Sequence, residues 1–216
     1  MGAENYRAIG TAKSNGTTII SVSGDCSRPG IYEYPFGVTV HDVLQECGAV
    51  NTRAVQISGP SGICVAESEF NRCLGFEDLP SAGAFMVFDD SRDMFEVARY
   101  YVHFFAHESC GFCTPCRVGT SMLKQTMDKI AEGHGTKHDL SEVEYLDKVL
   151  QISSHCGLGR SACNPVLHTL KRFRPAYESR LKTLDFEPAF DLDGALARAR
   201  QMTGRDDAGA HLEIEK

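Results

Sequence analysis

Three cysteines spaced two residues apart are the side chains of this sequence best suited to chemistry. Cys110, Cys113 and Cys116 form a C-x2-C-x2-C run, and Cys156 follows forty positions later. Such a run is one of the spacings that hold a [4Fe–4S] cluster, which takes four cysteine thiolates. One loop then supplies three ligands, and a distant segment supplies the fourth. The spacing predicts a [4Fe–4S] cluster on Cys110, Cys113, Cys116 and Cys156.

Two cysteines compete for the fourth position. Cys156 lies in the segment His-Cys-Gly-Leu-Gly, whose glycines give the backbone freedom to fold around a cofactor. Cys163 directly precedes Asn164-Pro165, where we expect a helix to begin, and it is more simply interpreted as a small packed residue. We therefore favour Cys156 as the fourth ligand.

The residues beside the cysteines also suit a cluster. Gly111 permits a tight turn and lets backbone N–H groups approach the sulfurs, and such hydrogen bonds help to set a reduction potential. Arg117 and Arg160 flank the two loops and could offset a cluster's negative charge. We expect His107 and His155 to be orienting or partly exposed histidines, not ligands.

Zinc binding and thiol redox chemistry fit the cysteine run less well. Structural zinc usually binds two C-x2–4-C knuckles, which three evenly spaced cysteines and one distant cysteine match poorly. A thioredoxin-type C-x-x-C needs a βαβ setting, whereas the flanks here are helical. The remaining cysteines fit no site by their spacing, and we interpret them as core or surface residues: Cys26, Cys47, Cys64 and Cys73.

Composition places the chain among ordinary globular proteins. Of its 216 residues, 42% are hydrophobic and 24% are charged, and the formal net charge is -7. This charge disfavours nucleic acid as a partner. No apolar run approaches the roughly 20 residues of a membrane helix, and residues 1–10 show no secretory signal. We expect a soluble cytoplasmic protein, in which nine cysteines, an odd number, do not indicate a disulfide framework.

The first half of the chain predicts short strands around one helix. Thr39 is expected to cap this helix, which runs over residues 40–47 and stops at Gly48. A turn at Arg28-Pro29-Gly30, with a positive φ at Gly30, joins the first two strands. Together these elements predict a small β-grasp-like α+β domain. The strands are expected at residues 17–23, 31–34, 54–58, 63–66 and 84–88.

The second half predicts a small bundle of four antiparallel helices. Ser91 is expected to cap the first helix, and Pro115 is expected to lie in the first turn of the second. The third helix is expected to begin at a capping box formed by Ser141 and Glu144, and the fourth at Asn164-Pro165. A loop over residues 153–162 carries Cys156. The expected fold class is α+β, a β-grasp-like domain followed by a four-helix iron–sulfur bundle and a tail. Its parts are an extended leader at 1–16, the β-grasp domain at 17–89, the helical [4Fe–4S] domain at 90–180 and the C-terminal tail at 181–216, with one weak helix at 192–202.

The cysteine segments and several segments of the first half of the chain resemble those of a known family. It is similar to the C-terminal half of the NADH-binding flavoprotein subunit of respiratory complex I, and closer still to the diaphorase flavoprotein of NAD-reducing hydrogenases and NAD-dependent formate dehydrogenases. The resemblance covers about residues 3–180, and its first part resembles the family's soluble ligand-binding β-grasp domain. The segments that carry it are Ser21–Asp25, Arg28–Glu33, Glu108–Gly119, Cys156–Gly159, Asn164–Val166 and, in the tail, Phe190–Asp193.

The resemblance implies a place in an electron-transfer chain. Cys110, Cys113, Cys116 and Cys156 would ligate a [4Fe–4S] cluster that receives electrons from FMN. The family's FMN and NAD(H) sites lie in an N-terminal domain that has no counterpart here, so both cofactors are expected on a partner domain or chain. A thioredoxin-like [2Fe–2S] subunit and other Fe–S, hydrogenase or dehydrogenase subunits are the further partners implied. The chain is then a split subunit or a truncated gene product.

Three hypotheses about function follow. The leading one is an iron–sulfur electron-transfer module of an NAD(H)-linked oxidoreductase, which passes single electrons between a flavin and further clusters. The alternative is a β-grasp binding or assembly module with a purely structural metal site. A complete enzyme is the weakest, since the sequence has no G-x-G-x-x-G after a strand, no P-loop and no catalytic motif.

Overall fold

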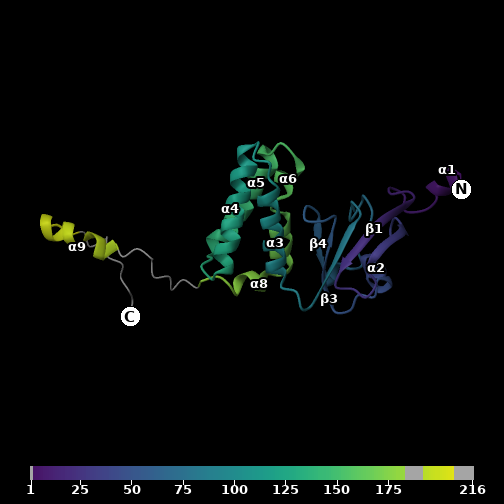
Figure 1. Cartoon of the computed structure of the whole chain (residues 1–216), viewed down its shortest axis with the longest axis horizontal. Helices are drawn as coiled ribbons and strands as arrows, with labels where there is room; N and C mark the ends of the chain where they lie inside the picture. Colours follow the sequence, from purple (N-terminus) through teal and green to yellow (C-terminus); the bar gives the residue numbers. More distant parts are fainter. Residues whose placement is uncertain (1, 183–191, 207–216) are drawn as a thin grey trace. The chain divides into compact units, whose positions relative to one another are not determined.

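The computed structural model describes residues 2–182 and 192–206, and the chain divides into two compact units, 1–181 and 182–216. The first unit begins with a mixed sheet and continues with helices (Figure 1). The α+β fold class expected from the sequence is therefore confirmed.

The sheet has five strands in the order β2-β1-β5-β3-β4. β1 and β2 form an antiparallel hairpin, β3 pairs antiparallel with β4 and β5, and β5 pairs parallel with β1. The central β5 thus joins the two hairpins into one sheet. The strands are β1 (Thr17–Gly24), β2 (Gly30–Pro35), β3 (Thr52–Ile57), β4 (Ile63–Ala66) and β5 (Ala84–Asp89).

One face of the sheet packs against α2 (Val40–Glu46). Thr39 caps this helix as expected, because its hydroxyl accepts the Asp42 N–H while the Asp42 carboxylate accepts the Thr39 N–H. Val40 and Val43 face the buried side chains of the sheet. The β-grasp-like core is therefore closed by one short, well-capped helix.

The helices form a second core. The four longest helices of the first unit, α3, α4, α5 and α7, surround buried apolar side chains that include Phe105, Leu123, Val143 and Val166. Figure 1 shows them gathered beside the sheet. The helices of this part are α3 (Met94–Glu108), α4 (Thr114–Ala131), α5 (Lys137–Ser153), α6 (Gly157–Ser161), α7 (Asn164–Arg172) and α8 (Arg174–Glu178).

The second face of the sheet packs against these helices. Phe88 of β5, Tyr101 of α3 and Phe173 belong to one buried cluster. An ion pair reinforces this contact, since Arg172 Nη2 donates to Glu69 Oε1 at 2.8 Å across the two parts of the unit. Sheet and helices therefore share a core and an ion pair.

We expect the Glu69→Gln substitution to destabilise the protein by about 3 kcal/mol at neutral pH. Hydrogen bonds from Arg172 lower the pKa of Glu69 to about 2, from the ordinary 4.5. The carboxylate therefore stabilises the fold at pH above 4.5, and this contribution is lost as the pH falls toward 2. Urea unfolding at pH 7, 4.5 and 3 measures the difference between wild type and variant, which should shrink across this range.

The exposed Glu67 is the matched control, because it lies in the same short 3-10 turn (Glu67–Glu69). Glu67→Gln should change the free energy of unfolding by less than about 0.5 kcal/mol. A Glu69→Gln variant as stable as wild type at pH 7 would contradict the role given to the ion pair.

The caps of two helices differ from the sequence prediction. The helix α3 is capped by Asp93, whose carboxylate accepts the Phe95 N–H, whereas Ser91 donates its hydroxyl to the carboxylate of Asp89 in the preceding turn. The helix α5 begins earlier than expected, at a capping box of Thr136 and Asp139.

Ser141, which we expected to open α5, lies inside the helix. Its hydroxyl donates to the His138 carbonyl one turn earlier, so it caps nothing. Both predicted caps, at Ser91 and at Ser141 with Glu144, are therefore wrong, because a better-placed acceptor lies a few residues away.

Three further segments depart from the sequence prediction. The expected extended leader contains the short helix α1 (Ala3–Arg7), and the expected loop around Cys156 contains α6. Gly30 does not take a positive φ, because it lies in β2 opposite Val22; Gly24, at the end of β1, takes it instead (φ 93°). The other predicted strands and helices lie within a few residues of their expected positions.

The second unit contains α9 (Leu192–Thr203), close to the helix expected at 192–202. Phe190 and Asp191, the start of the tail segment that resembles the family, lie outside the described residues. In the described parts of the chain, no helix is both long enough and apolar enough to cross a lipid bilayer.

Candidate metal centre

The cysteine run lies where α3 ends and α4 begins. Gly111 makes the tight turn expected of it, with a φ of 76°. Cys113 is the N-cap residue of α4, Pro115 lies in the first turn, and the helix buries Cys116. Cys110 is exposed on the same loop. The run therefore presents its thiols at the N-terminal end of a long helix.

The segment of Cys156 packs directly against this helix end. Cys156 is exposed and is the N-cap residue of α6, a single turn that contacts both α4 and α5. A Cβ added to Gly159 would lie 3.1 Å from the Cys116 Cβ and 2.7 Å from the Ser154 Cβ. Gly159 thus allows the two cysteine segments to approach closely. Neither Gly157 nor Gly159 has a positive φ, so close packing, and not the backbone freedom we expected, explains Gly159.

Three of the four thiols influence one another. The backbone N–H of His155 hydrogen-bonds the Cys113 thiol and lowers its pKa, because it stabilises the thiolate. Burial raises the pKa of Cys116, and the charges of Cys113 and Cys156 raise it further. The Ser109 Oγ lies 3.3 Å from the Cys116 Sγ. The structure therefore brings Cys113, Cys116 and Cys156 together, within reach of polar groups that suit sulfur.

The donor set is of the kind that a cluster requires. The four cysteines lie in two neighbouring segments, at the start of α4 and at the start of α6, and thiolates are the ligands of a [4Fe–4S] cluster. In a [4Fe–4S] cluster each thiolate binds a separate iron corner, so four spaced thiols are what the group requires. The buried Ser154 Oγ beside them has no hydrogen-bond partner in the described part of the chain. The residues fit the group, and the assignment of the four ligands stays a prediction.

Two arginines hydrogen-bond to backbone carbonyls of the cysteine segments. Arg117 donates to the Gly111 carbonyl, and Arg160 Nε donates to the Ser154 carbonyl at 3.1 Å. Phe112 packs edge-on against His155, with ring centroids 5.2 Å apart, so the two loops also meet through side chains. Sequence reasoning identified both arginines but missed the roles of Ser109, Ser154 and Phe112. The three missed residues lie within or next to the cysteine segments in the sequence, and this closeness could have identified them.

Cys163 lies in a different environment. It is 1% exposed and belongs to the apolar core of the helices. Burial raises the pKa of its thiol to about 12, so it stays protonated at neutral pH. This matches the packed role expected for it.

An apolar groove runs between α4 and α5 from the cysteine loop. Its volume is about 390 Å³, and Pro115, Val118, Met122 and Tyr145 are among the residues that line it. Val118 and Met122 are each 45% exposed, and the nearby loop residue Phe112 is 77% exposed. Exposed apolar side chains in one region are typical of a surface that another protein covers.

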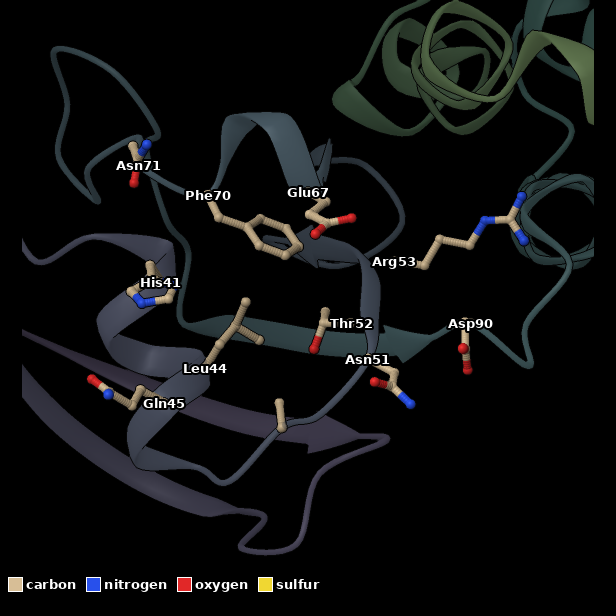
Figure 2. A pocket seen from close by; sticks show the side chains of 11 residues that line it. His41, Leu44, Gln45, Asn51, Thr52, Arg53, Glu67, Phe70, Asn71 and Asp90 are labelled. Carbon is tan, nitrogen blue, oxygen red and sulfur yellow. The ribbon is translucent and has the colours of Figure 1, made fainter.

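A second hollow, of about 850 Å³, lies in the sheet domain (Figure 2). Phe70 lies at its centre, while Glu67 and Asp90 add carboxylates to its lining. Arg53 also lines it, and its guanidinium carbon lies 5.4 Å from the centroid of the Phe173 ring.

The sheet and the helices define the class as an α+β protein with a cysteine-bearing helical region. Residues 96–180 match the NADH-ubiquinone oxidoreductase-F iron-sulfur binding region, and residues 19–63 match the SLBB domain. The chain is homologous to the C-terminal region of the flavoprotein subunits of NAD-reducing hydrogenases and NADH-quinone oxidoreductases. The resemblance stated from the sequence is confirmed.

Individual relatives share a substantial part of the sequence. The NAD-reducing hydrogenase HoxS subunit alpha of Cupriavidus necator is 43% identical over 198 residues, which are 90% of this chain and 33% of that protein. The NADP-reducing hydrogenase subunit HndC of Solidesulfovibrio fructosivorans is 32% identical over 191 residues, 83% of this chain and 39% of that protein. A subunit of the NADH-quinone oxidoreductase of Mycobacterium tuberculosis is 31% identical over 186 residues, 82% of this chain and 42% of that protein. The chain therefore spans less than half the length of these relatives.

A solved structure has the same fold. A chain in the crystal structure of NAD+-reducing [NiFe]-hydrogenase in the H2-reduced state is 47% identical, with a TM-score of 0.82. The match covers 98% of this chain and 38% of that chain.

Proposed function

We propose that the chain is an iron–sulfur electron-transfer module of an NAD(H)-linked oxidoreductase. The observation that carries the proposal is the match of residues 96–180 to an iron–sulfur binding region, because all four predicted ligands lie within it. Cys110, Cys113, Cys116 and Cys156 would hold one [4Fe–4S] cluster, which supplies one-electron transfer when bound.

The chain's own groups would tune this site. The His155 N–H and the Ser109 hydroxyl lie at the sulfurs of Cys113 and Cys116, where hydrogen bonds raise a cluster's reduction potential by stabilising negative charge. Arg117 holds a cysteine loop through a backbone carbonyl and adds positive charge on the exposed side. These groups favour a site that accepts an electron.

The names of the relatives and the exposed apolar side chains near the cysteines support a set of partners. A flavin- and NAD(H)-binding domain or chain would deliver the electrons, and a thioredoxin-like [2Fe–2S] subunit and other Fe–S subunits would receive them. The name of the Cupriavidus necator relative, a subunit of an NAD-reducing hydrogenase, supports a complex of this kind, for which we propose a cytoplasmic location. We expect the docking face to include Phe112, Val118 and Met122, with Arg117 and Arg160 at its edge.

Anaerobic purification should yield a brown protein with about four iron and four sulfide ions per chain, as one [4Fe–4S] cluster requires. Iron and acid-labile sulfide analysis measures both. The visible absorption should bleach with reductant and return with oxidant. Stoichiometric zinc without sulfide would instead support the alternative, a binding or assembly module with a structural metal site.

The purified chain should bind no FMN and should not reduce ferricyanide with NADH. NADH transfers two electrons as a hydride, whereas a cluster accepts one electron at a time, so a flavin must stand between them. Absorbance near the flavin band and a dye-reduction assay test this, and activity should appear when a flavin-carrying partner is added. A yellow protein that oxidises NADH at an enzyme-like rate would contradict the proposal that the chain only transfers electrons.

A further inference from the structure

Cys26 and Cys47 lie side by side where the β1–β2 hairpin meets the end of α2. Cys26 is partly exposed in the hairpin loop, whereas Cys47 is the C-cap residue of α2 and is 0% exposed. Both pack in the apolar core of the sheet domain, and their thiols are in hydrogen-bond contact. All nine cysteines are free thiols in the structure. A thiol that solvent can reach therefore touches one that it cannot.

Backbone hydrogen bonds hold these two segments together. The Arg28 N–H donates to the Cys47 carbonyl at 2.9 Å, and the Ser27 N–H donates to the Gly48 carbonyl at 3.3 Å. Arg28 Nε also donates to the Glu46 carbonyl at 2.9 Å. A disulfide needs Cα atoms less than about 7 Å apart, and this pairing keeps the loop that carries Cys26 against the helix end.

We propose that Cys26 and Cys47 are a redox-active pair that closes to a disulfide by exchange with a low-molecular-weight disulfide, such as glutathione disulfide. The Cys26 thiolate attacks the small disulfide, one glutathione thiol leaves, and a mixed disulfide forms on Cys26. The Cys47 sulfur then attacks the Cys26 sulfur and expels the second glutathione. Two protein thiols are oxidised, one small disulfide is reduced to two thiols, and the two protein protons pass to the leaving thiolates.

Burial fixes the order of the two steps. It raises the pKa of Cys47 to about 11, so this thiol stays protonated at neutral pH and cannot reach a solvent molecule. It reacts only when the exchange on Cys26 has placed a disulfide beside it. The closed pair would tie the last turn of α2, whose residues Leu44 and Gln45 line the hollow in Figure 2, to the hairpin loop.

The test uses the full chain under anaerobic conditions with excess glutathione disulfide at pH 8. Free thiols are then alkylated, and the protein is cleaved after glutamate, which places Cys26 and Cys47 in separate peptides. Mass spectrometry should show these two peptides joined, and dithiothreitol should release them. Fragmentation of the joined pair should assign the bond to Cys47 and not to Cys64, which lies in the same peptide. Cys73, also partly exposed in this domain, is the internal comparison and should not join either peptide.

Two variants separate the steps. Cys47→Ala should accumulate glutathione on Cys26, and Cys26→Ser should lose the joined peptides completely while Cys47 stays free. The proposal is overturned if wild-type Cys26 carries only glutathione while Cys47 is alkylated, or if both thiols are alkylated. Joined peptides that pair Cys26 with Cys73 as often as with Cys47 would also overturn it, because they would reveal an unfolded chain.

Discussion

Replacing Cys156 by serine should lower the content of intact [4Fe–4S] cluster at least about tenfold. The thiolate is the ligand, and a serine hydroxyl at the same place binds iron far less well at neutral pH. Iron and sulfide analysis gives the content, and electron paramagnetic resonance of the reduced protein shows whether a [4Fe–4S] signal remains. A residual cluster that has lost one iron is an expected product, since three ligands would still hold it.

Cys163→Ser is the matched control and should retain the cluster. Cys163 packs in the core of the helices, so the new hydroxyl should cost about 1–3 kcal/mol of stability without removing a ligand. Cys163→Ala avoids burying a hydroxyl and checks that any loss of cluster does not follow from instability. If Cys163→Ser loses the cluster and Cys156→Ser keeps it, Cys163 is the fourth ligand.

Gly159→Ala should destabilise the protein by about 1–3 kcal/mol and reduce its cluster content. The added methyl group would lie 2.7 Å from the Ser154 Cβ at the end of α5 and 3.1 Å from the Cys116 Cβ, so α6 must shift away from the end of α5 and, by less, from α4. That shift moves Cys156 relative to Cys116. Urea unfolding and the visible absorption per chain measure the two effects.

Gly157 provides the matched control within the same short helix. A Cβ added there meets nothing within 4 Å, and the backbone does not have a positive φ. Gly157→Ala should therefore leave the cluster content unchanged. The double variant Ser154→Gly with Gly159→Ala removes one of the two clashes and should recover part of the lost stability. Equal effects of the two single alanine substitutions would contradict the packing role of Gly159.

Local signals in the sequence predicted most of the fold. Thr39 and Gly48 bound α2 as expected, because each lies at the helix end with no competing cap residue beside it. The caps of α3 and α5 could not be predicted with the same success, since several acceptors lie close together near Asp93 and Thr136 and only the tertiary structure selects one. The parallel pairing of β1 with β5 is also not local, because it joins Ser21 to Ala84.

The candidate site was predictable in type but not in surroundings. The spacing of Cys110, Cys113 and Cys116 indicates the kind of chemistry directly, because three of the four predicted ligands lie in one short loop. That Gly159 packs on Cys116, and that the His155 N–H reaches Cys113, depends on how α6 lies against α4. Such contacts arise from tertiary packing, on which a single sequence carries little information.

The shared core of sheet and helices limits how the cysteine-bearing part can be used in protein engineering. A fragment that began at residue 90 would present Met94, Tyr101 and Phe173 to water, since Phe88 and the rest of the sheet face normally cover them. Such a fragment should aggregate. The sheet itself cannot be trimmed from its N-terminal end, because β1 pairs with the central β5. A shortened form of this chain that keeps the cysteine-bearing helices folded must therefore begin no later than Thr17.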